Sequence, residues 1–183
     1  MHYPENNMRL YIKIVVGIAV LVFVVVILNY FTVHRDMRET IESDPRNAGL
    51  VLFGYHDKLL IPGSIVIDLH DVAATNSAAD VFRLLLQFSA KQKDKEYKKI
   101  FISFRGTPKF YLKGDYFTRL GNEYSTQNSV YTMRTFPQNV FNVDGAPAYG
   151  TWTGGLLGVL GKQMEDFSDF HKRWYIADLS SSR

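Results

Sequence analysis

The residues that could do chemistry gather first in the segment DLHD, residues 68–71, directly after a hydrophobic run typical of a β-strand. In a strand, side chains two positions apart lie on one face, so Asp68 and His70 could act as an acid/base pair. A metal site normally takes three or four protein ligands, and only distant residues such as Asp115 or His171 remain to complete one. The simpler interpretation is a polar cluster that caps the strand end.

Two further polar residues belong to the same hypothesis. Asp71 ends the segment, and Arg105 lies in a predicted turn, where a guanidinium can bind a carboxylate or phosphate, although exposed turn arginines are more common. Ser103 stands in ISFRG and lacks the GxSxG spacing of a hydrolase nucleophile. His171 falls on the polar side of the last predicted helix, which favours a surface histidine. The catalytic candidates are therefore Asp68, His70, Asp71 and Arg105, and the sequence predicts no cofactor or metal site.

A glycine-rich stretch, TWTGGLLGVLGKQ at residues 151–163, is the second candidate site. A Walker loop requires a glycine five positions before Gly161 and a hydroxyl after Lys162. Leu156 and Gln163 occupy those two positions, and no GxGxxG fingerprint occurs, so neither phosphate-binding motif is present.

Helical geometry gives the glycines another explanation. At ~100° per residue, Gly154, Gly158 and Gly161 share one face of a helix, and each costs about 1 kcal/mol relative to alanine. Such a face favours close backbone approach by a strand of the same domain, by a partner helix or the membrane, or by a small ligand; we favour the first. If the chain binds a partner protein, Gly154, Gly158 and Gly161, with Trp152, are the interaction site that the sequence favours.

The composition excludes several classes of protein. The chain has 183 residues and a net charge of +3, which is too small and too dispersed for a nucleic-acid binder. No cysteine is present, so disulfides, thiolate nucleophiles and cysteine-ligated zinc are excluded. With 46% hydrophobic and 14% aromatic residues, most of the chain is expected to fold.

The strongest single signal lies near the N-terminus. Residues 14–28 (IVVGIAVLVFVVVIL) contain no polar side chain, and the apolar segment extends over residues 10–33. A helix of ~20 residues already spans a ~30 Å hydrocarbon core, so we predict a transmembrane helix embedded in lipid over residues 10–33. A cleaved signal peptide is the alternative, but its apolar region is normally shorter and a small-x-small cleavage site is missing.

The orientation of this helix is less strongly determined. Arg9 and Lys13 precede the apolar segment, whereas Arg35, Arg38 and Arg46 follow it, so the counts nearly balance. We expect a single-pass protein with a short cytoplasmic tail and an extracytoplasmic domain.

The elements that must position the candidate residues alternate along the chain. Strands are predicted over residues 50–55, 64–69, 99–104, 109–113 and 130–136, with turns at 61–63 and 105–108 and a loop at 137–150. Helices are predicted after an N-cap at Thr75 or Asn76, from 114 or 115 to a stop at Gly121, and along a stripe from Leu156 to Trp174. This order favours an α/β or α+β domain with a mixed sheet packed by helices.

The predicted organisation is a tail at residues 1–9, the membrane helix at 10–33, a juxtamembrane linker or short helix at 34–48 that stops at Pro45, one soluble domain at 49–179 and a tail at 180–183. The leading hypothesis is a membrane-anchored accessory protein that docks onto a larger membrane-associated assembly through its soluble domain. The alternative is a membrane-tethered hydrolase, or a domain that binds a small ligand, built on Asp68, His70 and Asp71.

Overall fold

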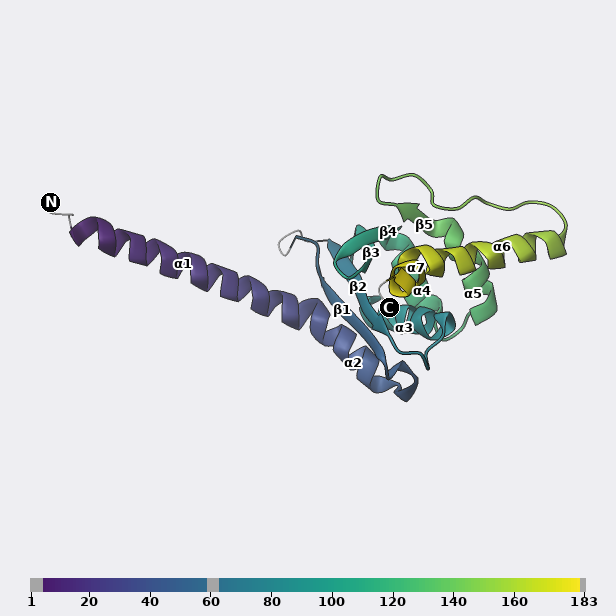
Figure 1. The fold of residues 1–183 in the computed structure, drawn as a ribbon, viewed down its shortest axis with the longest axis horizontal. Coiled ribbons are helices and arrows are strands. Elements are labelled where there is room, and N and C mark those ends of the chain that lie inside the picture. Colours follow the sequence, from purple (N-terminus) through teal and green to yellow (C-terminus); the bar gives the residue numbers. More distant parts are fainter. Residues whose placement is uncertain (1–4, 59–62, 182–183) are drawn as a thin grey trace.

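A computed structural model describes residues 5–58 and 63–181 of the chain, so the predicted turn residues Ile61 and Pro62 and parts of both predicted tails lie outside it. A long N-terminal helix projects from a body of strands and helices (Figure 1). This helix, α1 (Glu5–Asn29), continues through a π-helical turn, η1 (Tyr30–His34), into α2 (Arg35–Ser43). The run Met8–Ser43 contains 36 residues, and by length and composition it is able to cross a membrane.

The body contains a five-stranded sheet, which is mixed, as predicted; four of its strands coincide with predicted ones. Its strands are β1 (Leu50–His56), β2 (Ser64–Val72), β3 (Lys99–Phe104), β4 (Thr107–Lys113) and β5 (Val140–Asn142). They lie in the order β1-β2-β3-β4-β5, with β2 and β3 parallel and the other neighbours antiparallel. The parallel pair is connected by α3 (Ala78–Gln92), because two parallel neighbours require a crossover rather than a hairpin.

The N-terminal helix meets the sheet directly. Val33 and Met37 are fully buried against β1, where Gly54 leaves space: a Cβ there would lie 3.0 Å from Val33 Cγ1. The Asn29 side-chain oxygen also accepts a hydrogen bond of 2.7 Å from the His56 backbone N–H. The predicted juxtamembrane segment is therefore helical and packed on the domain, and α2 ends before a 3-10 turn at Pro45–Asn47.

Helix α3 packs on the same face of the sheet as α2. Its apolar residues Val81, Leu84, Leu85 and Phe88 are fully buried, which confirms the predicted helical stripe. The N-cap is Ser77, whose side chain accepts from the Asp80 backbone while Asp80 accepts from the Ser77 backbone. The predicted caps Thr75 and Asn76 were two and one residues early, because only Ser77 is followed by an acidic side chain at the third helical position.

Helix α4 (Gly114–Glu123) continues past the predicted stop at Gly121. A Cβ at Gly121 would overlap the backbone carbonyl of Ser89 in α3. This glycine therefore serves close packing between two helices, and the prediction of a C-terminal stop was wrong.

The segment predicted as a fifth strand at residues 130–136 is helical instead. Helix α5 (Ser129–Thr135) begins at Asn128, whose side-chain oxygen accepts hydrogen bonds from the N–H groups of Val130 and Tyr131. This cap stabilises a helix start that the β-branched composition had concealed. After a 3-10 turn at Pro137–Asn139, the predicted loop contains the short strand β5, which pairs with β4.

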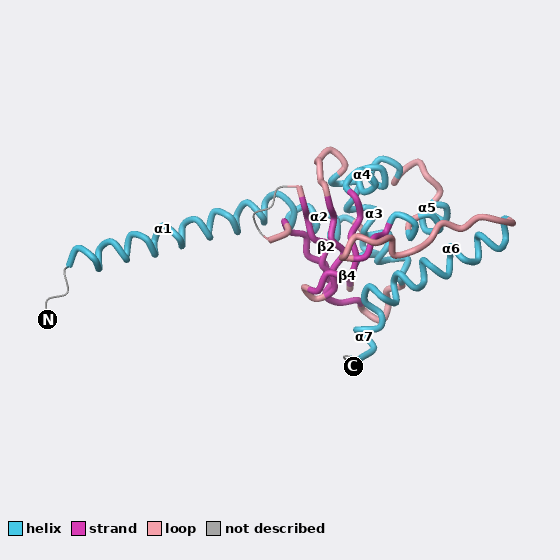
Figure 2. Tube along the Cα trace, turned by 90° about the horizontal axis from the view of Figure 1, so that it is seen from above, coloured by secondary structure: helices cyan, strands magenta, loops and turns pink. Residues whose placement is uncertain are grey.

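The chain ends in α6 (Leu156–His171), a π-helical turn η4 (Lys172–Ile176) and α7 (Ala177–Ser181). Phe170 and Trp174 are fully buried, and the Trp174 indole N–H donates to the Ser103 carbonyl oxygen at 2.9 Å. Gly154 lies before α6, with a φ of 129° that is incompatible with its predicted place inside the helix. In Figure 2 the helices α3, α4 and α5 lie on one side of the strands, while α1 leaves the body at the opposite end from α6.

Candidate functional site

The structure brings Asp68 and His70 together on one face of β2. Asp68 is 2% exposed, and its carboxylate lies 2.9 Å from His70 Nε2. It also accepts hydrogen bonds from the Tyr55 hydroxyl at 3.1 Å and from the Gly106 backbone N–H at 3.0 Å. Because three groups already surround this carboxylate, its evident role is to hold the β3–β4 turn against β2.

Within this cluster, Tyr55 is a hydrogen-bond donor to Asp68. Burial, and secondarily the Asp68 charge, raise the pKa of Tyr55 to about 12, so its phenol remains a donor at neutral pH. Ser103, the register partner of Asp68 on β3, is 1% exposed, and its hydroxyl makes no hydrogen bond within the described residues. A nucleophilic serine needs access to substrate and contact with a base, and Ser103 has neither here.

The remaining predicted candidates join the cluster only in part. The Arg105 Nε donates to the His70 carbonyl oxygen at 3.1 Å, so Arg105 lies beside the cluster. Asp71 is exposed, and within the described part of the chain no hydrogen bond or ion pair joins it to Asp68 or His70. Asp115 lies at the other end of β4 from Arg105, and no group of three His, Asp or Glu residues among those described could hold a metal ion.

His171 is a buried residue, and its prediction as a surface histidine was wrong. It is 1% exposed, and its ring contacts Phe82 of α3 as well as Phe167, Phe170, Trp174 and Tyr175 of its own segment. Neither ring nitrogen has a hydrogen-bond partner among the described residues, and burial lowers the pKa of His171 to about 3. The periodicity of one helix could not reveal that α3 covers this side of α6.

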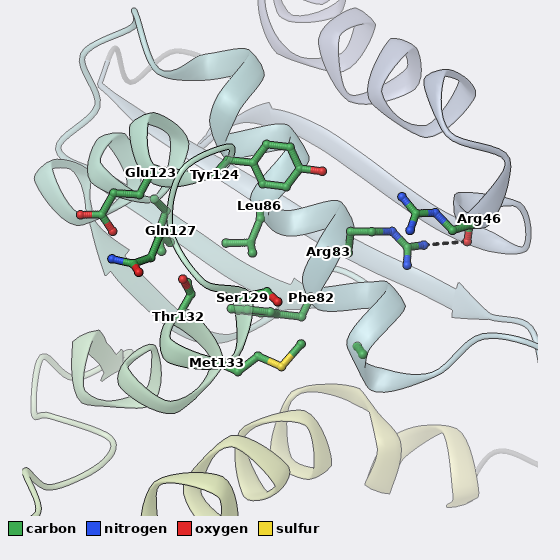
Figure 3. Close-up of a pocket in the computed structure, with 12 residues that line it drawn as sticks. Arg46, Phe82, Arg83, Leu86, Glu123, Tyr124, Gln127, Ser129, Thr132 and Met133 are labelled. Carbon is green, nitrogen blue, oxygen red and sulfur yellow. Dashed lines mark hydrogen bonds between the residues drawn. The ribbon is translucent and has the colours of Figure 1, made fainter. Parts of the chain in front are cut away.

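A pocket that sequence reasoning missed lies between α3, α4 and α5 (Figure 3). Its volume is about 350 Å³, with Phe82, Leu86 and Met133 among its apolar lining residues. Two arginines also line it, but the Arg83 guanidinium is 2.6 Å from Asp80 and Arg46 is 2.7 Å from Asp44. The two cations are thus balanced internally and do not define an anionic ligand. No sequence motif marks it, since its walls come from three separate helices.

The first half of α6 projects from the body (Figure 1). We call residues 152–164 the α6 arm. Leu157 is 82% exposed, and Trp152 and Met164 are also exposed. Beyond the helix itself, no atom of the described residues lies within 4 Å of where a Cβ would stand at Gly158 or Gly161. The favoured prediction, that these glycines approach a strand of the same domain, was therefore wrong.

The arm has its own internal support. The Trp152 indole N–H donates to the Asp166 carboxylate at 2.6 Å, which fastens the preceding loop to the helix. Lys162 pairs with Glu165 at 2.7 Å along the same surface. The arm is consequently a helical surface on which Trp152, Leu157, Gly158, Gly161 and Met164 face solvent in the isolated chain.

Comparisons with protein-family models, with curated proteins and with solved structures give no match for this chain.

Proposed function

We propose that this chain is a single-pass, membrane-anchored accessory protein that docks onto a larger membrane-associated assembly through the α6 arm. The observation that carries the proposal is the exposure of Leu157, Gly158 and Gly161 on an ordered projecting helix. An exposed apolar surface with glycines that cost helix stability is typical of a binding site rather than of a free surface.

The surface of α1 supports the proposed anchor. Its apolar side chains from Leu10 to Leu28 are almost all exposed in the isolated chain, as expected of residues that face lipid. At its end, Asn29, Val33 and Met37 are packed on β1 with no linker in between. The helix and the body would therefore act as one unit, with the domain held at the bilayer surface on the extracytoplasmic side.

A partner helix is the best match for the arm. Gly158 and Gly161 lie one turn apart and leave the backbone accessible, which permits the close approach of another helix. Leu157 and Met164 flank them and would be buried by such a partner.

The alternative, a hydrolase or ligand-binding domain using Asp68, His70 and Asp71, has less support. The Asp68 carboxylate is already engaged by Tyr55, His70 and Gly106, which leaves it little capacity for substrate or metal. Asp71 does not join it.

The arm is tested by Gly158→Leu in the full chain, expressed in its native membranes and purified in mild detergent. Because a side chain at this position meets open space, the variant should fold as the wild type does. It should also lose the proteins that co-purify with the wild type, because a leucine prevents close helix approach. Ser168→Leu, also exposed on α6 but outside the arm, is the matched control and should retain them. Unchanged co-purification with Gly158→Leu would reject the docking role.

The anchor is tested separately by alkaline carbonate extraction and protease protection of sealed membranes. We expect the intact chain to remain in the membrane pellet and its body to be cleaved only from the extracytoplasmic side. A chain that starts near residue 30, or that is released by carbonate, would contradict the anchor.

A further inference from the structure

A row of apolar side chains crosses all five strands. In the strand register, Tyr55 pairs with Val66, Val66 with Phe101, Phe101 with Tyr111 and Tyr111 with Phe141. Paired residues project from the same face of a sheet, so these five side chains form one continuous line, which we call the cross-strand row. The rings of Tyr111 and Phe141 are stacked, with centroids 5.2 Å apart.

The row lies on the face of the sheet away from α3. The opposite face is formed by residues such as Ile65, Ile67 and Ile102, which are fully buried under the helices (Figure 2). Within the described residues, the ring contacts of the row are among its own members and with two lysines. Tyr55, Phe101 and Phe141 remain half-exposed.

Such a surface departs from the usual pattern of a sheet with one covered face. In antiparallel sheets the outer face normally carries polar side chains that alternate with the buried ones. Along the row the outer positions are aromatic or aliphatic, and Phe53 on β1 adds another exposed ring beside it. The same face carries polar residues only on either side of the row, such as Asp68 with Ser103 and Lys99 with Lys113.

Val66 and Tyr111 are each only 6% exposed, so the accessible apolar surface is provided by Tyr55, Phe101, Phe141 and Phe53. A cluster of accessible apolar side chains of this kind marks an interaction site.

Two lysines give this surface a positive charge. Lys99 and Lys113 are register partners two residues along the strands from Phe101 and Tyr111, so they project from the same face as the row, and both are exposed. Their ammonium groups stand 4.5 Å from the Tyr111 ring centroid and 4.8 Å from that of Phe141. Neither forms an ion pair with a carboxylate in residues 5–58 and 63–181. The row is therefore bordered by two positive charges without an acidic partner among the described residues.

If the chain is anchored as proposed, a second copy of it is a poor binding partner for the row. Two copies inserted in the same direction in one bilayer can be related only by a two-fold axis along the membrane normal. Because α1 is packed on the body without a linker, residues of equal height would then face each other. Lys99 and Lys113 of the two copies would meet, and like charges across an interface are strongly unfavourable.

We propose that the cross-strand row binds a different protein whose surface places apolar side chains on the row and carboxylates against Lys99 and Lys113. This interface is separate from the α6 arm. The cations fix the partner's register, and burial of the row supplies the affinity.

The experiment places a photo-crosslinking benzoylphenylalanine at Phe101 in the full chain, in native membranes. Arg119, exposed on α4, is the control position for the same crosslinker. We expect a hetero-adduct from position 101 only, and mass spectrometry should find Asp or Glu in the crosslinked peptide.

Charge reversal then tests the proposed chemistry. Lys99→Glu with Lys113→Glu should lower the adduct yield at least about tenfold. The matched double variant Lys93→Glu with Lys98→Glu, which makes the same charge change outside the row, should leave the yield unchanged. Circular dichroism should show both variants folded, because all four side chains are exposed.

The outcomes separate this inference from the proposed function. An adduct between two copies, no adduct, or an adduct insensitive to the reversal at positions 99 and 113 would overturn the inference. Carbonate release of the same membranes would contradict the anchor instead, and loss of the adduct in Gly158→Leu would place the contact on the arm.

Discussion

The two halves of α6 differ although one apolar stripe runs through both. In the C-terminal half, Phe167, Phe170 and His171 are buried, with Phe82 and Phe136 packed against them from α3 and the residue after α5. In the N-terminal half, Leu157 and Gly158 face solvent. The same helical period therefore leads to a core where neighbouring elements exist, and to an open surface where they do not.

This difference indicates which half of α6 contributes to the stability of the fold. The buried half contributes the large aromatic side chains that join α6 to the sheet and to α3. The arm contributes glycines, which weaken a helix, and a leucine that the chain itself does not cover. The following predictions test whether stability resides in one half and binding in the other.

The largest effect is expected from Phe170→Ala. Phe170 is fully buried and its ring contacts Phe110, Phe136 and Trp174, so truncation leaves a cavity. The free energy of unfolding should fall by about 3–5 kcal/mol. Urea unfolding of the detergent-solubilised full chain, followed by tryptophan fluorescence, measures this, and a loss below about 1 kcal/mol would show that this half is not the core.

The second effect is acid sensitivity caused by His171. Its pKa is about 3 in the folded chain against 6.5 unfolded, so only the unfolded state takes up a proton as the pH falls below 6.5. Stability is therefore complete above that value and decreases as the pH falls towards 3. Between about pH 7 and pH 5 the loss from this group should be about 2 kcal/mol.

His171→Leu identifies the group responsible. The variant should remove about 2 kcal/mol of the loss between those two pH values in urea unfolding. Hydrogen bonds from Ser77 lower the pKa of Asp80 to about 2, so Asp80 does not contribute to the loss of stability between these two pH values. An unchanged pH dependence in the variant would contradict the burial of the imidazole.

A smaller effect of opposite sign is expected from Gly158→Ala. The added methyl group meets no atom of the described residues beyond the helix. The main change is therefore the higher helix propensity of alanine compared with glycine. The free energy of unfolding should rise by about 0.5–1 kcal/mol. Destabilisation would mean that the arm packs against something in the isolated chain.

The smallest effect is expected from Trp152→Phe, which keeps a ring but removes the N–H that binds Asp166. Global stability should change by about 0.5 kcal/mol or less, because the bond is exposed. Limited proteolysis of the loop before α6 should accelerate, since its end is no longer fastened. Equal cleavage rates in variant and wild type would show that this bond does not order the loop.

Local patterns were sufficient for most elements of the body. The strands around Val66 and Ile102, and the helix of Val81 to Phe88, follow directly from apolar runs and periodicity. The segment after Asn128 was assigned to the wrong class, because its β-branched residues resemble a strand and its cap is a single side chain. The conformation there is decided by the cap and by packing on α6.

The candidate sites depended more strongly on tertiary structure. The pairing of Asp68 with His70 follows from strand periodicity, but the approach of the Gly106 N–H depends on the β3–β4 turn. The cross-strand row joins residues as distant as Tyr55 and Phe141, and only the register places them in line. A sequence pattern cannot provide that register, because a shift of one residue would turn every side chain to the other face.

The packed junction between α1 and the body also has a mechanical consequence. With Asn29, Val33 and Met37 fixed on β1, no hinge separates the apolar helix from the domain, and the α6 arm lies at the far end of the molecule from α1 (Figure 1). A helix that spans lipid tilts when bilayer thickness changes. If α1 spans a membrane as proposed, that tilt would swing the whole body as a lever, so the distance that the arm reaches from the membrane would depend on the thickness of the surrounding lipid.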